Sequence, residues 1–480
     1  MELNNKKYYA GTLLFLMLFF VFSGRAQKPE GIPRYASVSA IIKDLSSRKV
    51  LAAYNPEKNM LSASLMKLVT TATALDLLGK DFKYSTKFWI SGPVKNGILE
   101  GDLIIEGGGD PTLGSKYFPS SYPDSVLLYV KKILNANGIN KINGKILVDE
   151  SYLKGSRYPS RRLWEDMGNY YGAPPAALSW RDNTFTIVLR SPEKIGARCS
   201  VVSISPSVEN VSFDCQVIAA KHDKDSAYIY GLSGLERWEI RGSIPAGRNH
   251  FRIKGALPEP GLIFADEVVN LLDDSDNIVI EKINNDDWRA KAQPIGQLYS
   301  PPLSDIVRAI NHFSINLAAD HLLISIGQTA RQENVSDWDV GIQLIKNYWA
   351  NNKQSYFLNI KDGSGLAPQS SVSPAFLVDM LADIYSDSSR FETFKNSLAI
   401  SGVSGTLKYI WNQSALKGVV YGKSGSMKDV LGYAGCVFRD GQSPLAFAVM
   451  VNHHGKDNSE IKKYIERWLE KMVELGDEQN

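Results

Sequence analysis

Residues 64–79 read Ser64-Leu65-Met66-Lys67-Leu68-Val69-Thr70-Thr71-Ala72-Thr73-Ala74-Leu75-Asp76-Leu77-Leu78-Gly79, and this stretch decides the fold of the chain. Apolar and small side chains surround its helical projection, a pattern typical of a buried helix rather than a surface helix. Glycine commonly ends helices, and Gly79 ends this pattern. The sequence therefore predicts a buried helix that begins at Ser64, with Lys67 one turn later on the same face.

This spacing of serine and lysine also indicates chemistry. A serine hydroxyl becomes a strong nucleophile when a neighbouring base accepts its proton. The bare pattern is common here, because five other serines have a lysine at the third following position: Ser46, Ser151, Ser191, Ser414 and Ser459. Only Ser64 opens a long buried helix. There, free backbone N–H groups favour an oxyanion and burial favours a neutral, basic lysine. An ordinary N-cap serine followed by a solvated lysine is the alternative interpretation.

Two further polar clusters fit the same chemistry. In His312-Phe313-Ser314-Ile315-Asn316, the hydroxyl of Ser314 is suited to relay a proton and the amide of Asn316 to hold a substrate amide. In Lys423-Ser424-Gly425-Ser426, which we expect at the end of a strand, the lysine and hydroxyl suit a carboxylate, and the glycine allows close approach of a substrate backbone. Taken singly, the first cluster is a helix cap and the second a polar strand end.

The remaining elements follow from residue periodicity. Short β-rich runs separated by turn signals extend from about Ser85 to Ile283 and predict one or two mainly β domains. A hairpin precedes the buried helix, further helices follow the β-rich region, and an antiparallel sheet lies near the C-terminus. The expected ranges are Ser37–Asp44 with Lys49–Tyr54 for the hairpin, Leu303–Ile326, Pro374–Ser386 and Ser459–Glu474 for helices, and Gly418–Lys423, Gly432–Phe438 and Leu445–Val451 for the sheet.

The N-terminus has the features of a secretory leader. Lys6 and Lys7 precede the apolar run Thr12–Phe22, and the small residues Gly24 and Ala26 suit signal peptidase. An uncleaved anchor is the alternative, but a bilayer span needs about 20 apolar residues. We expect residues 1–26 to be removed and the mature protein to be periplasmic, with no stable membrane insertion.

Composition excludes several classes of protein. The 480 residues are 44% hydrophobic and 22% charged with a formal net charge of +3, which describes a multidomain globular protein without the basic character of nucleic-acid binders. Three cysteines are too few for a disulfide-built fold and lack zinc-site spacing. Cys199 and Cys215 are close enough in sequence to pair across a local hairpin, with Cys436 buried and reduced.

The three polar clusters, in this order, resemble the triple signature of serine penicillin-recognising enzymes, whose third element is Lys-Thr/Ser-Gly. From about residue 35 onward the chain is similar to the D-alanyl-D-alanine carboxypeptidase/endopeptidase family, the class C low-molecular-mass penicillin-binding proteins. The segments that carry this similarity are Gly101–Leu103, Gly109–Leu113, Trp164–Asp166, Tyr170–Pro174, Ser300–Leu303 and Asp362–Leu366.

The resemblance implies an α+β fold. Its core is β-lactamase/transpeptidase-like, an antiparallel sheet flanked by helices with a helical lobe, and mainly β domains are inserted in it. Members carry these insertions between the first two motifs, which lie far apart in this chain. We therefore expect a catalytic domain from residues 27–84 and 290–480, an inserted domain II from residues 85–185 and 262–289, and an inserted domain III from residues 186–261.

The resemblance also assigns roles to residues. It implies Ser64 as nucleophile, Lys67 as base for acylation, and Ser314 and Asn316 on the opposite wall. Lys423, Ser424 and Gly425 are expected along the substrate, and the backbone N–H groups of Ser64 and Ser426 in the oxyanion hole. Asp166 matches a family aspartate that reaches the cleft from the inserted region, although a surface turn acid is the plainer interpretation.

The implied activity is acyl transfer from peptidoglycan peptides that end in D-Ala-D-Ala, or from D-alanyl cross-links, through an ester on Ser64. β-Lactams are expected to acylate the same serine, and no metal or organic cofactor is required. A β-lactamase is the alternative enzyme, but the chain lacks the Glu-x-x-Leu-Asn segment of class A. It also lacks a Gly-x-Ser-x-Gly elbow and a His-Glu-x-x-His motif. A catalytically weak wall-binding penicillin receptor is the non-enzymatic alternative.

Overall fold

The computed structural model describes residues 28–273, 278–351 and 356–477 and divides the chain into two units. The first unit contains residues 1–61, 372–392 and 399–480, and the second contains residues 62–371 and 393–398. The predicted leader, residues 1–26, lies outside the described residues. Within the described ranges, no helix has the length and apolar character needed to cross a membrane.

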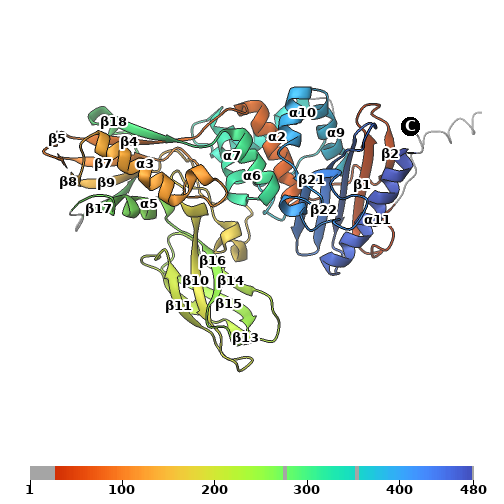
Figure 1. Ribbon diagram of the computed structural model, residues 1–480, viewed down its shortest axis with the longest axis horizontal. Coiled ribbons are helices and arrows are strands. Elements are labelled where there is room, and N and C mark those ends of the chain that lie inside the picture. The colour runs from red at the N-terminus through yellow and green to blue at the C-terminus, as the bar shows by residue number, and fades with distance from the viewer. Residues whose placement is uncertain (1–27, 274–277, 352–355, 478–480) are drawn as a thin grey trace, which may run out of the picture. The chain divides into compact units, whose positions relative to one another are not determined.

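The first unit is built on a six-stranded antiparallel sheet with the order β2-β1-β23-β22-β21-β20 (Figure 1). Its strands are β1 (Ser37–Asp44), β2 (Val50–Tyr54), β20 (Ala399–Ile400), β21 (Val420–Met427), β22 (Val430–Val437) and β23 (Leu445–Asn452). The predicted hairpin and the three predicted C-terminal strands are confirmed. β21 is longer than predicted, because its pairing with β22 continues to Met427, opposite Val430. The Lys423-Ser424-Gly425 segment therefore lies within the strand and not at its end.

Helices cover both faces of this sheet. α11 (Asn458–Asp477) confirms the predicted helix Ser459–Glu474 and packs Ile461, Ile465, Trp468 and Leu469 into the same hydrophobic cluster as the sheet. α9 (Pro374–Tyr385) contacts β1, β22 and β23. The ion pair between its Asp379 and Lys43 places it on the opposite face, because Lys43 alternates along β1 with residues that point toward α11.

The second unit contains a bundle of helices around α2 (Met66–Leu78). The other helices are α6 (Leu303–Phe313), α7 (Asn316–Gln328) and α8 (Asp337–Asn351). The predicted buried helix is confirmed, since every residue from Met66 to Ala74 is buried. Its α-helical part begins two residues later than predicted, because the 3-10 turn η1 (Ala63–Leu65) precedes it. The predicted helix Leu303–Ile326 is divided at Ser314, which has a left-handed backbone conformation.

A mixed sheet with the order β17-β9-β7-β4-β18 forms the next layer of this unit (Figure 1). The strands are β4 (Ser85–Ser91), β7 (Asp102–Glu106), β9 (Lys145–Asp149), β17 (Val279–Ile283) and β18 (Gln293–Tyr299), with a small sheet of β5 (Val94–Lys95), β6 (Ile98–Leu99) and β8 (Lys141–Ile142). α3 (Pro123–Ala136) and α5 (Pro260–Val269) contribute to the same hydrophobic cluster as the strands. The region predicted as mainly β thus contains helices as well.

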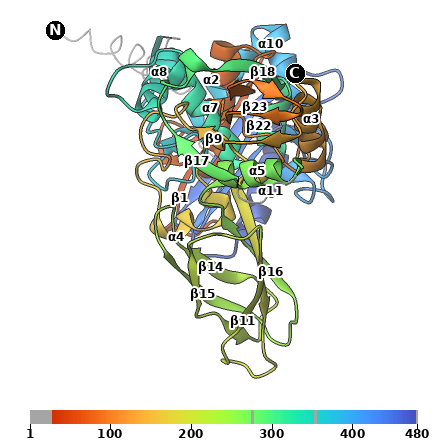
Figure 2. The same ribbon diagram turned by 90° about the vertical axis from the view of Figure 1, so that its left-hand side faces the viewer.

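Two small sheets have a hydrophobic cluster of their own (Figure 2). One consists of β10 (Thr184–Arg190), β11 (Ser200–Ser205) and β16 (Phe251–Ala256), the other of β12 (Ser212–Cys215), β13 (Ile218–Ala220), β14 (Ser226–Tyr230) and β15 (Arg237–Pro245). Cys199 and Cys215 both border this cluster as free thiols. The expected disulfide between them is therefore not formed in this structure.

Candidate active site

Ser64 and Lys67 meet at the beginning of α2. Ser64 lies in the turn η1, which starts at Ala63 with a positive φ of 43°. The Nζ atom of Lys67 lies 2.9 Å from the Oγ atom of Ser64. The three-residue spacing brings both side chains to the same side of the helix start. The structure therefore places the predicted nucleophile and the predicted base in direct hydrogen-bond contact.

Lys67 has two further oxygen partners. Its Nζ atom lies 2.6 Å from Oδ1 of Asn316 and 2.7 Å from the backbone oxygen of Ser364. The side chain is completely buried. The pKa of the Lys67 amine is lowered to about 7; burial is the largest cause, and Asp320 and Asp362 oppose it while Arg162 acts in the same direction as burial. An amine with this pKa is partly neutral near neutral pH.

The break between α6 and α7 positions the second predicted cluster. Ser314 ends α6 with φ 59° and ψ 42°, and its N–H donates to the carbonyl of Ile310 at 2.8 Å. α7 begins at Asn316, whose Nδ2 donates to the carbonyl of Tyr171 at 2.8 Å. The amide of Asn316 is thus fixed from both sides, with its nitrogen toward Tyr171 and its oxygen toward Lys67. Asn316 joins Ser64 and Lys67, and Ser314 lies two residues before it at the turn.

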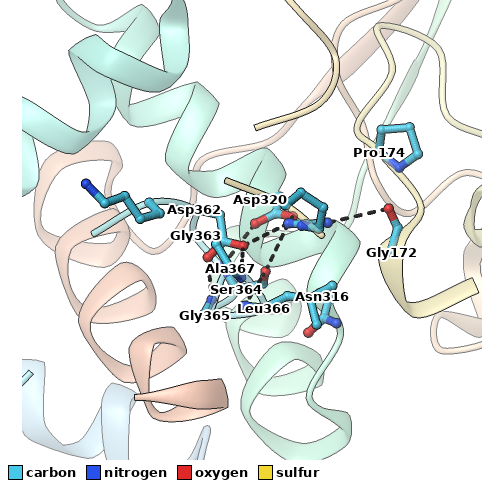
Figure 3. A network of polar contacts seen from close by, with 12 residues as sticks. Gly172, Pro174, Asn316, Asp320, Asp362, Gly363, Ser364, Gly365, Leu366 and Ala367 are labelled. Atoms are coloured by element: carbon cyan, nitrogen blue, oxygen red, sulfur yellow. Dashed lines mark hydrogen bonds and ion pairs between the residues drawn. The ribbon is translucent and has the colours of Figure 1, made fainter. Parts of the chain in front are cut away.

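The loop of residues 362–367 supplies the third partner of Lys67, and Figure 3 shows it beside Asp320 and Asn316. The guanidinium of Arg162 lies 2.8 Å from Oδ2 of Asp320 and 2.9 Å from Oδ2 of Asp362, and all three side chains are completely buried. The sequence did not indicate Arg162 or Asp320. Arg162 lies two residues before the Trp164–Asp166 segment but has no charged partner near it in the sequence, and Asp320 lies inside an apolar helix, so neither gives a periodic signal. In the sequence, the Asp362–Leu366 segment carries family resemblance but no sign of contact with Lys67.

Asp166 lies on α4 (Trp164–Met167), four residues after Arg162. It is half-buried and hydrogen-bonded by the side chain of Tyr171. Burial raises the pKa of the Asp166 carboxyl, while the bond from Tyr171 and the charge of Arg162 oppose the rise. The segment that carries Asp166 is therefore connected to the bundle helices through Arg162 and through the carbonyl of Tyr171.

The third predicted cluster lies on β21 in the first unit. Lys423 is completely buried, and its Nζ donates to the carbonyl of Ser424 at 2.7 Å. The hydroxyl of Ser424 donates to that of Thr406 at 3.1 Å, and Oγ of the exposed Ser426 lies 3.1 Å from Nδ2 of Asn458. β20 pairs only with Tyr421 and Gly422. Within the described part of the chain, the outer edge of β21 beyond Gly422 has no strand partner.

Comparison with known proteins agrees with this arrangement. The D-Ala-D-Ala carboxypeptidase 3 (S13) family model matches residues 26–472. The D-alanyl-D-alanine carboxypeptidase DacB of Haemophilus influenzae is 25% identical over 442 residues, 90% of this chain and 88% of that protein. A D-alanyl-D-alanine carboxypeptidase of an Actinomadura species is 26% identical over 440 residues, 86% and 77% of the two chains.

The fold agrees with a solved structure. The crystal structure of penicillin binding protein 4 (dacB) from Haemophilus influenzae aligns with a TM-score of 0.79 at 21% identity, over 92% of this chain and 97% of that chain. The expected transpeptidase-like core with inserted domains is therefore confirmed as the fold class. Because the family model spans nearly the whole described chain, this protein belongs to the D-Ala-D-Ala carboxypeptidase 3 (S13) family and is a serine-type D-alanyl-D-alanine carboxypeptidase.

Proposed function

We propose that the protein cleaves peptidoglycan peptides through an acyl-enzyme on Ser64, with Lys67 as the base. The observation that carries this proposal is the set of contacts of the Lys67 amine, which lies 2.9 Å from Oγ of Ser64 and touches two other oxygens. A neutral amine has two N–H bonds and one lone pair. Neither the amide oxygen of Asn316 nor the carbonyl of Ser364 can donate a proton. Both N–H bonds are therefore directed to these acceptors, and the lone pair remains for the Ser64 hydroxyl.

Acylation then combines nucleophilic attack by Ser64 with transfer of its proton to the leaving amine. Lys67 takes the proton of Ser64 while Oγ attacks the carbonyl of the penultimate D-alanine. The tetrahedral intermediate collapses, the C–N bond breaks, and the leaving amine receives the proton by way of Ser314. Water hydrolyses the resulting ester. When the leaving group is a terminal D-alanine the reaction is a carboxypeptidase step, and when it is a cross-linked amine the reaction is an endopeptidase step.

The other predicted residues have binding roles in this proposal. Asn316 holds a substrate amide as well as orienting Lys67. The unpaired edge of β21 offers backbone groups for an extended substrate, and Lys423 and Ser424 bind its carboxylate. The backbone N–H groups of Ser64 and Ser426 stabilise the oxyanion. Asp166 binds an amino group on the stem peptide.

We also propose the domain division that the resemblance implies. Residues 27–84 and 290–480 form the catalytic domain, residues 85–185 and 262–289 form inserted domain II, and residues 186–261 form inserted domain III. The separate hydrophobic clusters of the two inserted regions support their division from each other, and Leu298 of β18 joins the cluster of inserted domain II from just outside its proposed bounds. We further propose export to the periplasm with cleavage after Ala26, which N-terminal sequencing of the mature protein tests directly.

The release of D-alanine from a peptide ending in D-Ala-D-Ala tests the proposed function. We expect release by the wild type and by Ser46→Ala, and none by Ser64→Ala. Ser46 is a matched control because it also precedes a lysine by three residues. Equal release by Ser64→Ala would contradict the proposal. Cross-linked muropeptide dimers in the same assay measure the endopeptidase step, and rapid turnover of penicillin would instead indicate a β-lactamase.

A further inference from the structure

Arg162 forms a buried ion cluster next to the amine of Lys67. Its Nη2 atom contacts one oxygen of Asp320 at 2.8 Å and one oxygen of Asp362 at 2.9 Å, and its Nη1 atom lies 3.4 Å from the carbonyl of Gly172. No part of the three charged side chains reaches solvent. The two carboxylates come from α7 and from the loop of residues 362–367, while Arg162 comes from the β-rich region. One guanidinium thus connects three separate parts of the second unit.

The same two carboxylates hold the backbone of the loop. Asp320 accepts from the N–H of Ser364 at 2.9 Å, and Asp362 accepts from the N–H groups of Gly365 at 2.7 Å and Ala367 at 2.8 Å. Figure 3 shows how these contacts converge on the loop. In this orientation the Ser364 carbonyl points at Nζ of Lys67, 2.7 Å away. The position of that acceptor therefore depends on carboxylates that Arg162 holds in place.

The cluster is costly to bury, which points to a role beyond stability. Buried ion pairs lose most of their hydration, and well-packed apolar residues of the same volume stabilise a core equally well or better. Two carboxylates without Arg162 would lie unneutralised beside Lys67 and would favour its protonated form. A guanidinium suits this position because it is always charged, and its Nη2 atom contacts both carboxylates while Nη1 lies near the carbonyl of Gly172.

We propose that Arg162 is a positioning residue for Lys67, which fixes the Ser364 carbonyl through Asp320 and Asp362 and neutralises these carboxylates so that the amine can be free of its proton. This inference rests on the proposed role of Lys67 as the base. It makes the inserted region a participant in catalysis, because Arg162 lies outside the helices that carry Ser64, Lys67 and Asn316.

Three charged groups around Lys67 affect its pKa and therefore the pH dependence of acylation. Asp320 faces it from α7, Asp362 from the loop and Arg162 from the inserted region. The other two helices packed on α2 contact it through uncharged side chains. Asn311 of α6 contacts Thr71, and Tyr348 of α8 contacts Asp76, which lies at the far end of α2 from Lys67.

The sign of each charge change follows from this arrangement. Arg162→Gln removes a positive charge, so the carboxylates hold the proton on Lys67 more firmly and the neutral amine forms only at higher pH. Asp320→Asn removes a negative charge and has the opposite effect. The double variant Arg162→Gln/Asp320→Asn removes one charge of each sign and restores the balance. Each unit of upward shift lowers the neutral fraction below the transition about tenfold.

The test is the second-order rate of acylation by a fluorescent penicillin, measured from about pH 5 to pH 10 for these variants. In the plot of rate against pH, the acidic limb is the part where the rate rises as Lys67 loses its proton. We expect this limb to move to higher pH in Arg162→Gln, to lower pH in Asp320→Asn, and to return near the wild-type position in the double variant. Arg331→Gln is the matched control, because it removes an arginine from the buried Asp337, which is not among the groups that act on Lys67. Its limb is expected to stay in place.

The proposal would be overturned if the acidic limbs of all folded variants coincided, even if the variants were acylated more slowly. Such a result would mean that Arg162 has a structural role alone. Thermal melts report folding. If Arg162→Gln does not fold, the Asp320→Asn and double variants decide the sign, and Arg162→Lys, which keeps the charge, is expected to retain the wild-type limb. A wild type that is not acylated on Ser64 would contradict the proposed function instead, which keeps the two failures distinguishable.

Discussion

The amine of Lys67 is surrounded by three oxygen atoms from three different segments: the start of α2, the start of α7 and the loop around Ser364. Burial destabilises the protonated amine relative to the neutral one and so lowers the pKa of Lys67. Lys67→Arg tests whether the lone pair or the positive charge matters. An arginine remains protonated in proteins, so it supplies a charge but no base.

We expect Lys67→Arg to lower the acylation rate about 10²- to 10⁴-fold, the usual contribution of a general base. Stopped-flow or gel-based labelling with a fluorescent penicillin measures this rate, and a thermal melt confirms folding. In the wild type the rate should fall about tenfold for each pH unit below about 7, because Lys67 is then protonated. A folded Lys67→Arg protein that labels at the wild-type rate would show that Lys67 is not the base.

Asn316 offers a second test at this scale. Asn316→Asp places a carboxylate where Oδ1 now lies 2.6 Å from Nζ of Lys67, so the pKa of the amine should rise. We expect an acidic limb at higher pH and a loss of about tenfold or more in acylation rate near neutral pH. Asn316→Ala is the control, since it removes both hydrogen bonds without adding charge. Identical pH profiles for the two variants would contradict the electrostatic explanation.

The sequence predicted the individual side chains of this site unevenly. The three-residue spacing of Ser64 and Lys67 indicated that they are close, whereas the place of Asn316 beside them followed only from the family resemblance. Arg162 and Asp320 were not found, because their relation is one of distance in space between a β-rich region and a helix. The residues next to a buried charged residue in the sequence do not indicate which distant residue will form its ion pair.

At the scale of elements, the loop after Asp362 is packed against the turn that carries Ser64. Gly365 has a φ of 73°, and a Cβ atom added there would lie 1.9 Å from the carbonyl oxygen of Ala63. The left-handed conformation alone costs other residues about 1–2 kcal/mol. A side chain at this position must also displace the backbone immediately before Ser64.

Gly365→Ala is therefore expected to lower the acylation rate more than stability alone explains. Gly138→Ala is the matched control, because Gly138 has a similar φ of 66° but no atom within 4 Å of the added Cβ. Both variants should lose about 1 kcal/mol or more of stability. Only Gly365→Ala should lose acylation, and a wild-type labelling rate in that variant would refute the coupling between loop and turn.

Element boundaries show where sequence patterns are informative. The hairpin β1–β2 and helices α9 and α11 were found because apolar periodicity continues through each of them. The division of α6 from α7 was not found, because the left-handed conformation at Ser314 interrupts the backbone without interrupting the apolar pattern. α3 and α5 were missed within a region whose dominant signal is short strands and turns.

At the scale of the whole molecule, the hydrophobic clusters are separate. The cluster around Trp238 contains only residues from the region of inserted domain III, apart from Phe185 and Ile263 at its border. Leu323 of α7 is buried in the helical part of the same unit, beside Gly363 of the loop. Loss of a large side chain at each site should therefore have different consequences for catalysis.

Trp238→Ala and Leu323→Ala should each lose about 2–5 kcal/mol of stability. We expect Trp238→Ala to keep the wild-type rate of penicillin labelling at a temperature where it is folded, and Leu323→Ala to label more slowly because the loop that holds Lys67 loses support. Calorimetry and labelling on the same samples provide the measurement. A large loss of labelling in folded Trp238→Ala would contradict the independence of that region.

The long-range order of the chain follows from sequence only in part. β1 pairs along its whole length with β23, although they are separated by nearly the entire chain. Apolar alternation identified both strands but not their pairing, since alternation shows which face of a strand is buried and not which distant strand lies beside it. Family resemblance supplied what periodicity lacked, and the family match over residues 26–472 accounts for why the fold class was predicted correctly.

The identity of the acylated residue tests the central claim most directly. Tryptic digestion after treatment with benzylpenicillin should release the peptide of residues 59–67, which contains both Ser62 and Ser64. The hydroxyl of Ser62 is buried and donates to the carbonyl of Ser370, so it has no free path to a substrate. We predict that fragmentation mass spectra place the penicilloyl group on Ser64 alone. An adduct on any other residue, or an unmodified wild-type peptide, would contradict the assignment of Ser64 as the nucleophile.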